Sequence, residues 1–173
     1  MPAIQQLPVH CQNKYFFLFV DVHTRKKWIR FGKNKSDLNR EFKEWLGYIE
    51  VETGTRPKLF APDGGGEFNN NDLLNHLKKQ HILFEISCTD CPNQNAVVER
   101  ANGVVQTHIH KLLAQSGLPN KYWEDAGRFS IEVSNAMPVK SQNWVSPNKA
   151  WNPVKCDKTL QRVRTFGCEA WYV

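Results

Sequence analysis

Residues 15–20, YFFLFV, form an almost wholly apolar run that is rich in aromatic side chains. A strand that is covered on both faces shows such a continuous apolar run, so this segment is predicted to be a central strand. The next apolar positions, Trp28 and Phe31, stand among basic residues in residues 26–31, KKWIRF. Because only a short polar connection separates the two runs, we expect an antiparallel hairpin.

Helical and extended patterns alternate after this hairpin. Apolar residues at three- and four-residue steps predict a helix over 36–54, capped by Ser36 and ended by Gly54. The remaining segments are predicted as strands at 57–61, 81–86 and 165–173, helices at 72–80 and 94–115, a helix that opens at Pro119, and an ordered loop near 138–153. This order predicts an α/β protein with a mixed sheet flanked by helices.

Size and composition favour one compact domain. The chain has 173 residues, of which 40% are hydrophobic, and this is enough to build a core. No apolar run approaches the roughly 20 residues that a membrane-spanning helix needs, and residues 1–10, MPAIQQLPVH, do not resemble a secretory signal. The five cysteines are irregularly spaced, which suits reduced thiols. We therefore expect an intracellular protein.

The net charge of +6 is concentrated in the second part of the chain. Residues 1–99 hold 13 Lys and Arg against 12 Asp and Glu, for +1, whereas residues 100–173 hold 10 against 5, for +5. A basic region favours a polyanionic partner such as nucleic acid, because neutralising phosphates releases condensed counterions. A solvated basic surface with no such partner is an equally good interpretation of the charge alone.

Two carboxylates are candidates for metal chemistry. Asp63 follows the strand predicted at 57–61 and precedes three consecutive glycines, which allow a substrate to approach the backbone. Glu99 lies near the start of the helix predicted at 94–115, and the 35 residues between the two acids can return the chain to the same place. Taken singly, each acid has an ordinary interpretation, as a turn residue or as a partner of a helix dipole.

Five segments resemble the catalytic core of copia-type retrotransposon integrases, in their order and spacing. They are YFFLFVD, APDGGGEF, CPNQNAVVER, SGLPNKYWEDA and RVRTFGCEAWYV, which together span nearly the whole chain. The resemblance implies an RNase H-like fold and a polynucleotidyl transferase that joins element DNA ends to target DNA. It also implies that Asp63 is the second catalytic aspartate, that Glu99 is the catalytic glutamate, and that both bind Mg²⁺ or Mn²⁺.

The resemblance also predicts that one acid is missing. Two metal ions about 4 Å apart bracket the reacting phosphate in such chemistry, and these hard cations need several carboxylate oxygens. In cores of this type the first aspartate precedes the aromatic-rich strand, so Asp21 is the wrong position, and residues 1–10 contain no Asp or Glu. We therefore expect a core over 1–137 that lacks its first strand, an extension over 138–173, and no activity of this fragment alone.

Other expectations concern partners. A polar stripe, Asn102, Gln106 and His110, follows Glu99 at helical spacing and, with Lys111 nearby, is predicted to lie along DNA. Gly103 stands where the family often has a basic residue. RNA is a second candidate ligand, and the intact family protein is expected to form a homo-oligomer that acts in the nucleus. The alternative function is a non-catalytic remnant of a transposable element that binds nucleic acid or a protein partner.

Overall fold

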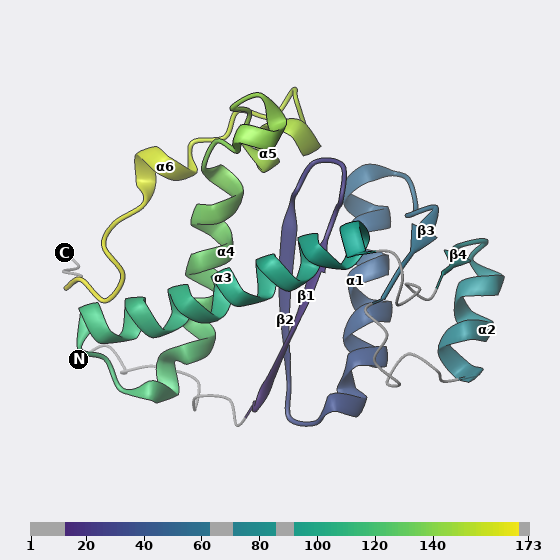
Figure 1. Ribbon diagram of the computed structural model, residues 1–173, viewed down its shortest axis with the longest axis horizontal. Coiled ribbons are helices and arrows are strands. Elements are labelled where there is room, and N and C mark those ends of the chain that lie inside the picture. The colour runs from purple at the N-terminus through teal and green to yellow at the C-terminus, as the bar shows by residue number, and fades with distance from the viewer. Residues whose placement is uncertain (1–12, 63–70, 86–91, 170–173) are drawn as a thin grey trace, which may run out of the picture. The chain divides into compact units, whose positions relative to one another are not determined.

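The computed structural model describes residues 13–62, 71–85 and 92–169, in which short strands alternate with helices (Figure 1). The elements are β1 (Tyr15–Val20), β2 (Lys27–Gly32), η1 (Lys35–Asp37), α1 (Leu38–Thr53), β3 (Leu59–Phe60), α2 (Asn71–Lys79), β4 (Leu83–Phe84), α3 (Pro92–Ser116), η3 (Asn120–Tyr122), α4 (Trp123–Ala136), η4 (Lys140–Gln142), α5 (Pro147–Trp151) and α6 (Thr159–Arg162). The predicted α/β class is confirmed. None of the described helices is long and apolar enough to cross a lipid bilayer.

The chain divides into two compact units. The central unit comprises Lys14–Leu18 and Arg30–Ala101, and the C-terminal unit comprises Met1–Asn13, Phe19–Ile29 and Asn102–Val173. The predicted division into 1–137 and 138–173 stays a prediction. So does the predicted loss of an earlier strand, because residues 1–12 lie outside the described part of the chain.

Strands β1 and β2 form the predicted hairpin. The Lys14 amide donates to the Gly32 carbonyl at 2.9 Å, and the Asp21 amide donates to the Lys26 carbonyl at 2.8 Å, so the start of β1 faces the end of β2. In the turn, Arg25 has a φ of 64°, a left-handed conformation that is uncommon outside glycine. The hairpin is therefore closed by a specific turn as well as by its two apolar strands.

Helix α1 buries the apolar face that its periodicity predicts. Its buried residues are Leu38, Phe42, Trp45, Leu46 and Ile49. Gly54 ends the helix at a φ of 68°, as predicted, and its amide donates to the Glu50 carbonyl at 2.8 Å. The predicted cap at Ser36 is wrong, because α1 begins after the turn η1 and its N-cap is Asp37. The Asp37 carboxylate accepts hydrogen bonds from the amides of Lys33 and Asn34, at 2.8 and 2.9 Å.

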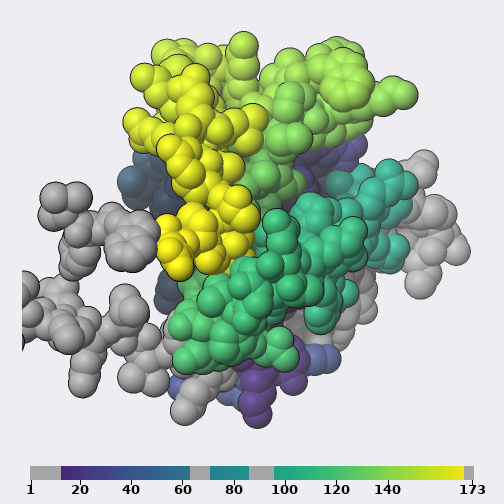
Figure 2. Space-filling model, turned by 90° about the vertical axis from the view of Figure 1, so that its left-hand side faces the viewer, coloured from purple at the N-terminus to yellow at the C-terminus, as the bar shows by residue number. Residues whose placement is uncertain are grey.

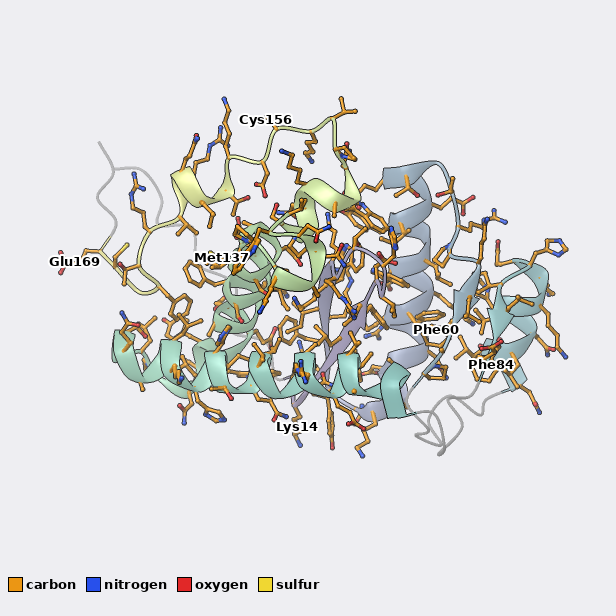
Figure 3. All side chains as sticks on the ribbon, turned by 45° about the horizontal axis from the view of Figure 1, so that its top comes forward. Lys14, Phe60, Phe84, Met137, Cys156 and Glu169 are labelled. Carbon is orange, nitrogen blue, oxygen red and sulfur yellow. The ribbon has the colours of Figure 1, made fainter. Side chains whose placement is uncertain are left out.

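Strands β3 and β4 form a separate parallel pair, in the register Leu59 with Leu83 and Phe60 with Phe84. Both are only two residues long, shorter than the runs predicted at 57–61 and 81–86. Between ring centroids, Phe60 lies 4.1 Å from Phe42 and 6.2 Å from Phe84. Figure 3 labels Phe60 and Phe84 on the two strands. These aromatic contacts hold the short parallel pair on α1.

Helix α3 has the predicted apolar face and is longer than predicted at both ends. In the C-terminal unit its buried positions are Val105, Ile109 and Leu113, and Gly117 follows its end at a φ of 67°. Helix α4 buries its small and polar residues more completely than most of its large apolar ones. Trp123, Phe129 and Val133 are only half-buried, whereas the buried positions are Glu124, Ala126, Gly127, Ser130, Ile131, Asn135 and Ala136. Two of the polar residues on this covered face have hydrogen-bond partners there: His108 Nδ1 lies 3.0 Å from Ser130 Oγ, and Asn135 bonds to the backbone of Lys27.

The strand predicted at 165–173 is wrong over the residues that the structure describes, 165–169. A turn occupies this place, closed by a hydrogen bond from the Cys168 amide to the Thr165 carbonyl at 3.1 Å. Gly167 has a φ of 77°, and a Cβ atom added there would lie 2.5 Å from the Cβ of Ser116. The chain therefore turns at Gly167 because it passes so close to the end of α3.

Candidate functional site

Glu99 lies on α3 in the central unit and is exposed to solvent. The helix begins at Pro92, two residues before the predicted start, so Glu99 lies about two turns into it. Within the residues that the structure describes, its carboxylate has no ion-pair or hydrogen-bond partner. A carboxylate that stands on a helix and has no such partner is chemically suited to bind a hard divalent cation.

Asp63 lies outside the described residues, so the predicted meeting of Asp63 with Glu99 stays a prediction. The chain that leads to Asp63 is described as far as the buried Pro62. Strand β3 ends at Phe60, which places Asp63 three residues beyond the carboxyl end of a strand in a parallel pair. In open α/β sheets, ligands bind beyond the carboxyl ends of the strands.

In the described part of the chain, no group of three or more His, Cys, Asp and Glu side chains could hold a metal ion. The carboxylate of Asp21 forms hydrogen bonds within the hairpin turn. Its Oδ2 accepts from the amide and the hydroxyl of Thr24, at 2.7 and 2.5 Å. The carboxylate of Asp21 therefore stabilises the turn between β1 and β2.

The predicted nucleic-acid stripe lies on the part of α3 that belongs to the C-terminal unit. Gln106, His110 and Lys111 are exposed, and Asn102 is half-buried. One side of this helix forms part of the surface in Figure 2, where it is the teal to green band. The stripe is accessible to a partner, whereas the opposite side of the same helix is covered.

Sequence reasoning did not single out Lys27 and Ser134. The Nζ of Lys27 donates to Ser134 Oγ at 3.0 Å. Burial, together with the nearby charge of Arg25, lowers the pKa of the Lys27 amine below its usual 10.5. The run of basic residues 25–27 is visible in the sequence, but its burial against α4 comes from a contact between residues more than a hundred positions apart.

The fold is that of retroviral integrase catalytic cores. The chain is similar to the magnesium-bound integrase catalytic core domain of HTLV-2 in its trimeric form, with a TM-score of 0.60 and 17% identity over 78% of this chain and 82% of that one. It is also similar to a chain of the simian T-cell lymphotropic virus intasome, solved in complex with the PP2A regulatory subunit B56 gamma. That match has a TM-score of 0.65 and 16% identity, and covers 79% of this chain and 48% of the other.

In sequence, the chain is similar to retrovirus-related Pol polyproteins of plant transposons. It is 26% identical over 159 residues to that of transposon TNT 1-94 from Nicotiana tabacum, which covers 92% of this chain and 12% of the polyprotein. It is 27% identical over 164 residues to that of transposon RE1 from Arabidopsis thaliana, which covers 94% of this chain and 11% of the relative. No protein-family model matches. The chain thus has the fold of integrase catalytic cores, and it is similar to a segment that makes up about a tenth of these polyproteins.

Proposed function

We propose that this chain is a copia-type integrase core that takes part in DNA integration by metal-dependent polynucleotidyl transfer. One observation carries the proposal: nearly the whole chain is similar to Pol polyproteins of transposons, and its fold is that of integrase catalytic cores. In the proposed site, Asp63 and Glu99 hold Mg²⁺ or Mn²⁺. The metal supplies Lewis acidity at the reacting phosphate and lowers the pKa of the attacking hydroxyl or water.

The described geometry supports Glu99 as a ligand more directly than Asp63. Glu99 is exposed and uncommitted on α3, so binding a cation would break no existing ion pair among the described residues. Asp63 follows β3, which Phe42 and Phe84 hold through aromatic contacts with Phe60. Helix α3 and strand β3 thus provide two supported positions in the same compact unit.

DNA is the proposed partner, both as element ends and as target. The exposed residues Gln106, His110 and Lys111 would contact the sugar-phosphate backbone, and the net charge of +5 over residues 100–173 would favour such contacts. RNA is a second possible ligand of the same surface. We further propose homo-oligomerisation and a nuclear place of action, which DNA integration requires.

The 173-residue chain by itself is expected to join DNA ends poorly. Two metal ions need a third carboxylate to bridge them. Asp21, the acid at the end of β1, already accepts two hydrogen bonds from Thr24. Recruiting it as a ligand would break the turn that it stabilises.

Metal binding tests the site separately from activity. Mn²⁺ binding to the 173-residue chain is measured by electron paramagnetic resonance or calorimetry, for the unchanged chain and for Asp63→Asn and Glu99→Gln. Because even outer-shell partners of a metal are worth about tenfold in affinity, each substitution is expected to weaken binding at least tenfold. Glu132→Gln, which removes another exposed helical glutamate, is the matched control and is expected to bind normally. Unchanged binding in both site variants would remove them as ligands.

Strand transfer separates the proposed function from the non-catalytic alternative. The chain is incubated with a labelled element-end duplex and target DNA in Mg²⁺ or Mn²⁺, and joined products are resolved by size. An integrase core should show metal binding that depends on Asp63 and Glu99, even if few ends are joined. A remnant that only binds nucleic acid should bind DNA equally well with both acids replaced and without any metal. Efficient joining by the chain alone would contradict the expected need for a third carboxylate.

A further inference from the structure

The turn between β1 and β2 carries two neighbouring cations that have no acidic partner in the described structure. Arg25 and Lys27 are both half-buried. They lie close enough that the charge of Arg25 contributes to lowering the pKa of the Lys27 amine, after the larger effect of burial. Bringing two like charges together in a partly desolvated place is unfavourable unless an anion compensates them.

Lys27 is held firmly in this position. Its backbone amide donates to Asn135 Oδ1 at 3.0 Å, and its backbone carbonyl accepts from Asn135 Nδ2 at 2.8 Å. Its Nζ donates to Ser134 Oγ, which leaves two further N–H bonds on the amine. The hydroxyl hydrogen of Ser134 is also free to donate to a ligand.

Arg25 presents an unpaired donor at the same turn. Its backbone has a φ of 64°, and its amide donates to the Asp21 carbonyl at 2.8 Å, so the backbone of Arg25 is fixed within the turn. Its Nε is buried and has no hydrogen-bond partner within the described residues. A buried guanidinium N–H without a partner is costly and is usually matched by a carboxylate or a phosphate.

The acids and other groups around this turn do not supply that match. The Asp21 carboxylate accepts its hydrogen bonds from Thr24, and the α4 side chains that hydrogen-bond to Lys27 are the neutral Ser134 and Asn135. Residues 1–12 and 170–173, which belong to the same unit and lie outside the described part, contain no Asp or Glu. By contrast, the adjacent Lys26 lies 5.6 Å from the ring centroids of Trp28 and Trp151, and its charge helps to lower the pKa of Asp157.

We propose that Arg25, Lys27 and Ser134 form a binding site for a phosphate group. The site offers a planar guanidinium, an ammonium and a hydroxyl, all able to donate, while the carboxylate of the same turn, that of Asp21, is hydrogen-bonded to Thr24. Guanidinium and ammonium groups form strong charge-assisted hydrogen bonds to phosphate oxygens. This site is in the C-terminal unit and does not depend on the metal site proposed at Asp63 and Glu99.

Protection of the Lys27 amine tests the site in the unchanged chain. The protein is acetylated with limiting acetic anhydride at neutral pH, and modification of Lys27 and Lys26 is compared by mass spectrometry. Inorganic phosphate, against chloride at equal ionic strength, is expected to slow acetylation of Lys27 severalfold and to leave Lys26 unchanged. Equal slowing at both lysines, or at neither, would overturn the proposal.

Repeating the acetylation with duplex DNA in place of inorganic phosphate distinguishes a site for backbone phosphodiesters from a site for a small phosphate compound. Protection of Lys27 by both inorganic phosphate and DNA supports a site that accepts backbone phosphodiesters. Protection by inorganic phosphate alone supports a site for a small phosphate compound. Protection by DNA alone would mean that a wider surface is covered, and would overturn the site as proposed.

Substitutions provide the second measurement. Phosphate affinity is followed by the rise of the melting temperature with phosphate concentration, which reports binding to the folded state. Arg25→Gln and Lys27→Gln are each expected to weaken binding about tenfold, because each removes a charged hydrogen-bond donor. Lys26→Gln removes the same charge one residue away, from a side chain that lies near Trp28 and Trp151, and is expected to change affinity less than about twofold. If Lys26→Gln weakens binding as much as Lys27→Gln, the effect is general charge and the site is refuted.

Discussion

The side chain of Asn135 pairs with both backbone polar groups of Lys27, although the two residues are 108 positions apart in the chain. Lys27 donates its amide to Asn135 Oδ1 at 3.0 Å and accepts from Asn135 Nδ2 at 2.8 Å. The amide side chain thus acts as a short neighbouring strand for the start of β2. It satisfies an amide and a carbonyl that would otherwise be left without partners as α4 covers this strand.

Replacing Asn135 with Leu should destabilise the chain by about 1–3 kcal/mol, because the buried amide and carbonyl of Lys27 lose their partners. Leucine has a similar volume, so the loss reflects hydrogen bonding more than a cavity. Urea unfolding followed by circular dichroism measures the change. Asn120→Leu, at an exposed position, is the control and should have little effect. Equal losses in the two variants would argue against the pairing.

Phe42→Ala should cost about 3–5 kcal/mol, the usual range for removing a fully buried phenylalanine. Phe42 is 0% exposed and its ring lies 4.1 Å from that of Phe60. The same substitution should speed hydrogen exchange of the Leu83 amide, which donates to the Lys58 carbonyl across the parallel pair. Tyr48→Ala, at a position on α1 that is 48% exposed, is the control. A cost below about 1 kcal/mol for Phe42→Ala would show that β3 does not depend on this contact.

Gly103→Ala should stabilise the chain by about 1 kcal/mol, the propensity difference between the two residues inside a helix. A Cβ atom at Gly103 would meet nothing within 4 Å, and the position is exposed on α3. Gly103→Lys should keep much of this gain. It should also steepen the salt dependence of DNA binding by about one phosphate contact.

Gly47→Lys is the charge-matched control for that experiment. Gly47 is also exposed within a helix and has nothing within 4 Å of the added Cβ. Both lysine variants should gain stability, but only Gly103→Lys should tighten DNA binding. Tighter binding in both would place the effect in net charge rather than in the polar stripe of α3.

Asp37 should make the chain less stable in acid. Hydrogen bonds from the amides of Asn34 and Lys33 hold the pKa of this carboxyl below its usual 3.8. The unfolded chain therefore binds the proton more readily, so the contribution of Asp37 is complete above about pH 4 and is lost as the pH falls through the lower folded pKa.

Comparison with Asp37→Asn isolates this contribution. The difference in unfolding free energy between the unchanged chain and the variant should be constant from pH 7 to pH 5 and should shrink below pH 4. Because Asp37 is only half-buried, the difference should be small at every pH. A difference that grows toward low pH would reverse the assigned sign.

Local patterns were sufficient to predict most elements of this fold. The aromatic run of β1, the apolar steps of α1 and the glycines after α1 and α3 are signals that act within a few residues, so they are visible without tertiary structure. Predictions failed where a distant contact overrides the local pattern. The chain turns at Gly167, where it passes next to Ser116. The covered face of α4 includes Ser130 and Asn135, because each forms a hydrogen bond with a residue far away in the sequence.

For the candidate sites, too, some features follow from the sequence and others only from the tertiary structure. The sequence by itself determined the resemblance to integrase cores and the choice of Asp63 and Glu99, because residue types and their spacing carry that information. Only the tertiary structure decided that Asp21 serves a turn, that the amine of Lys27 lies against Ser134, and that Arg25 Nε is buried without a hydrogen-bond partner among the described residues. The physical reason is that burial and charge compensation depend on groups brought together by folding, and spacing along the chain does not reveal them.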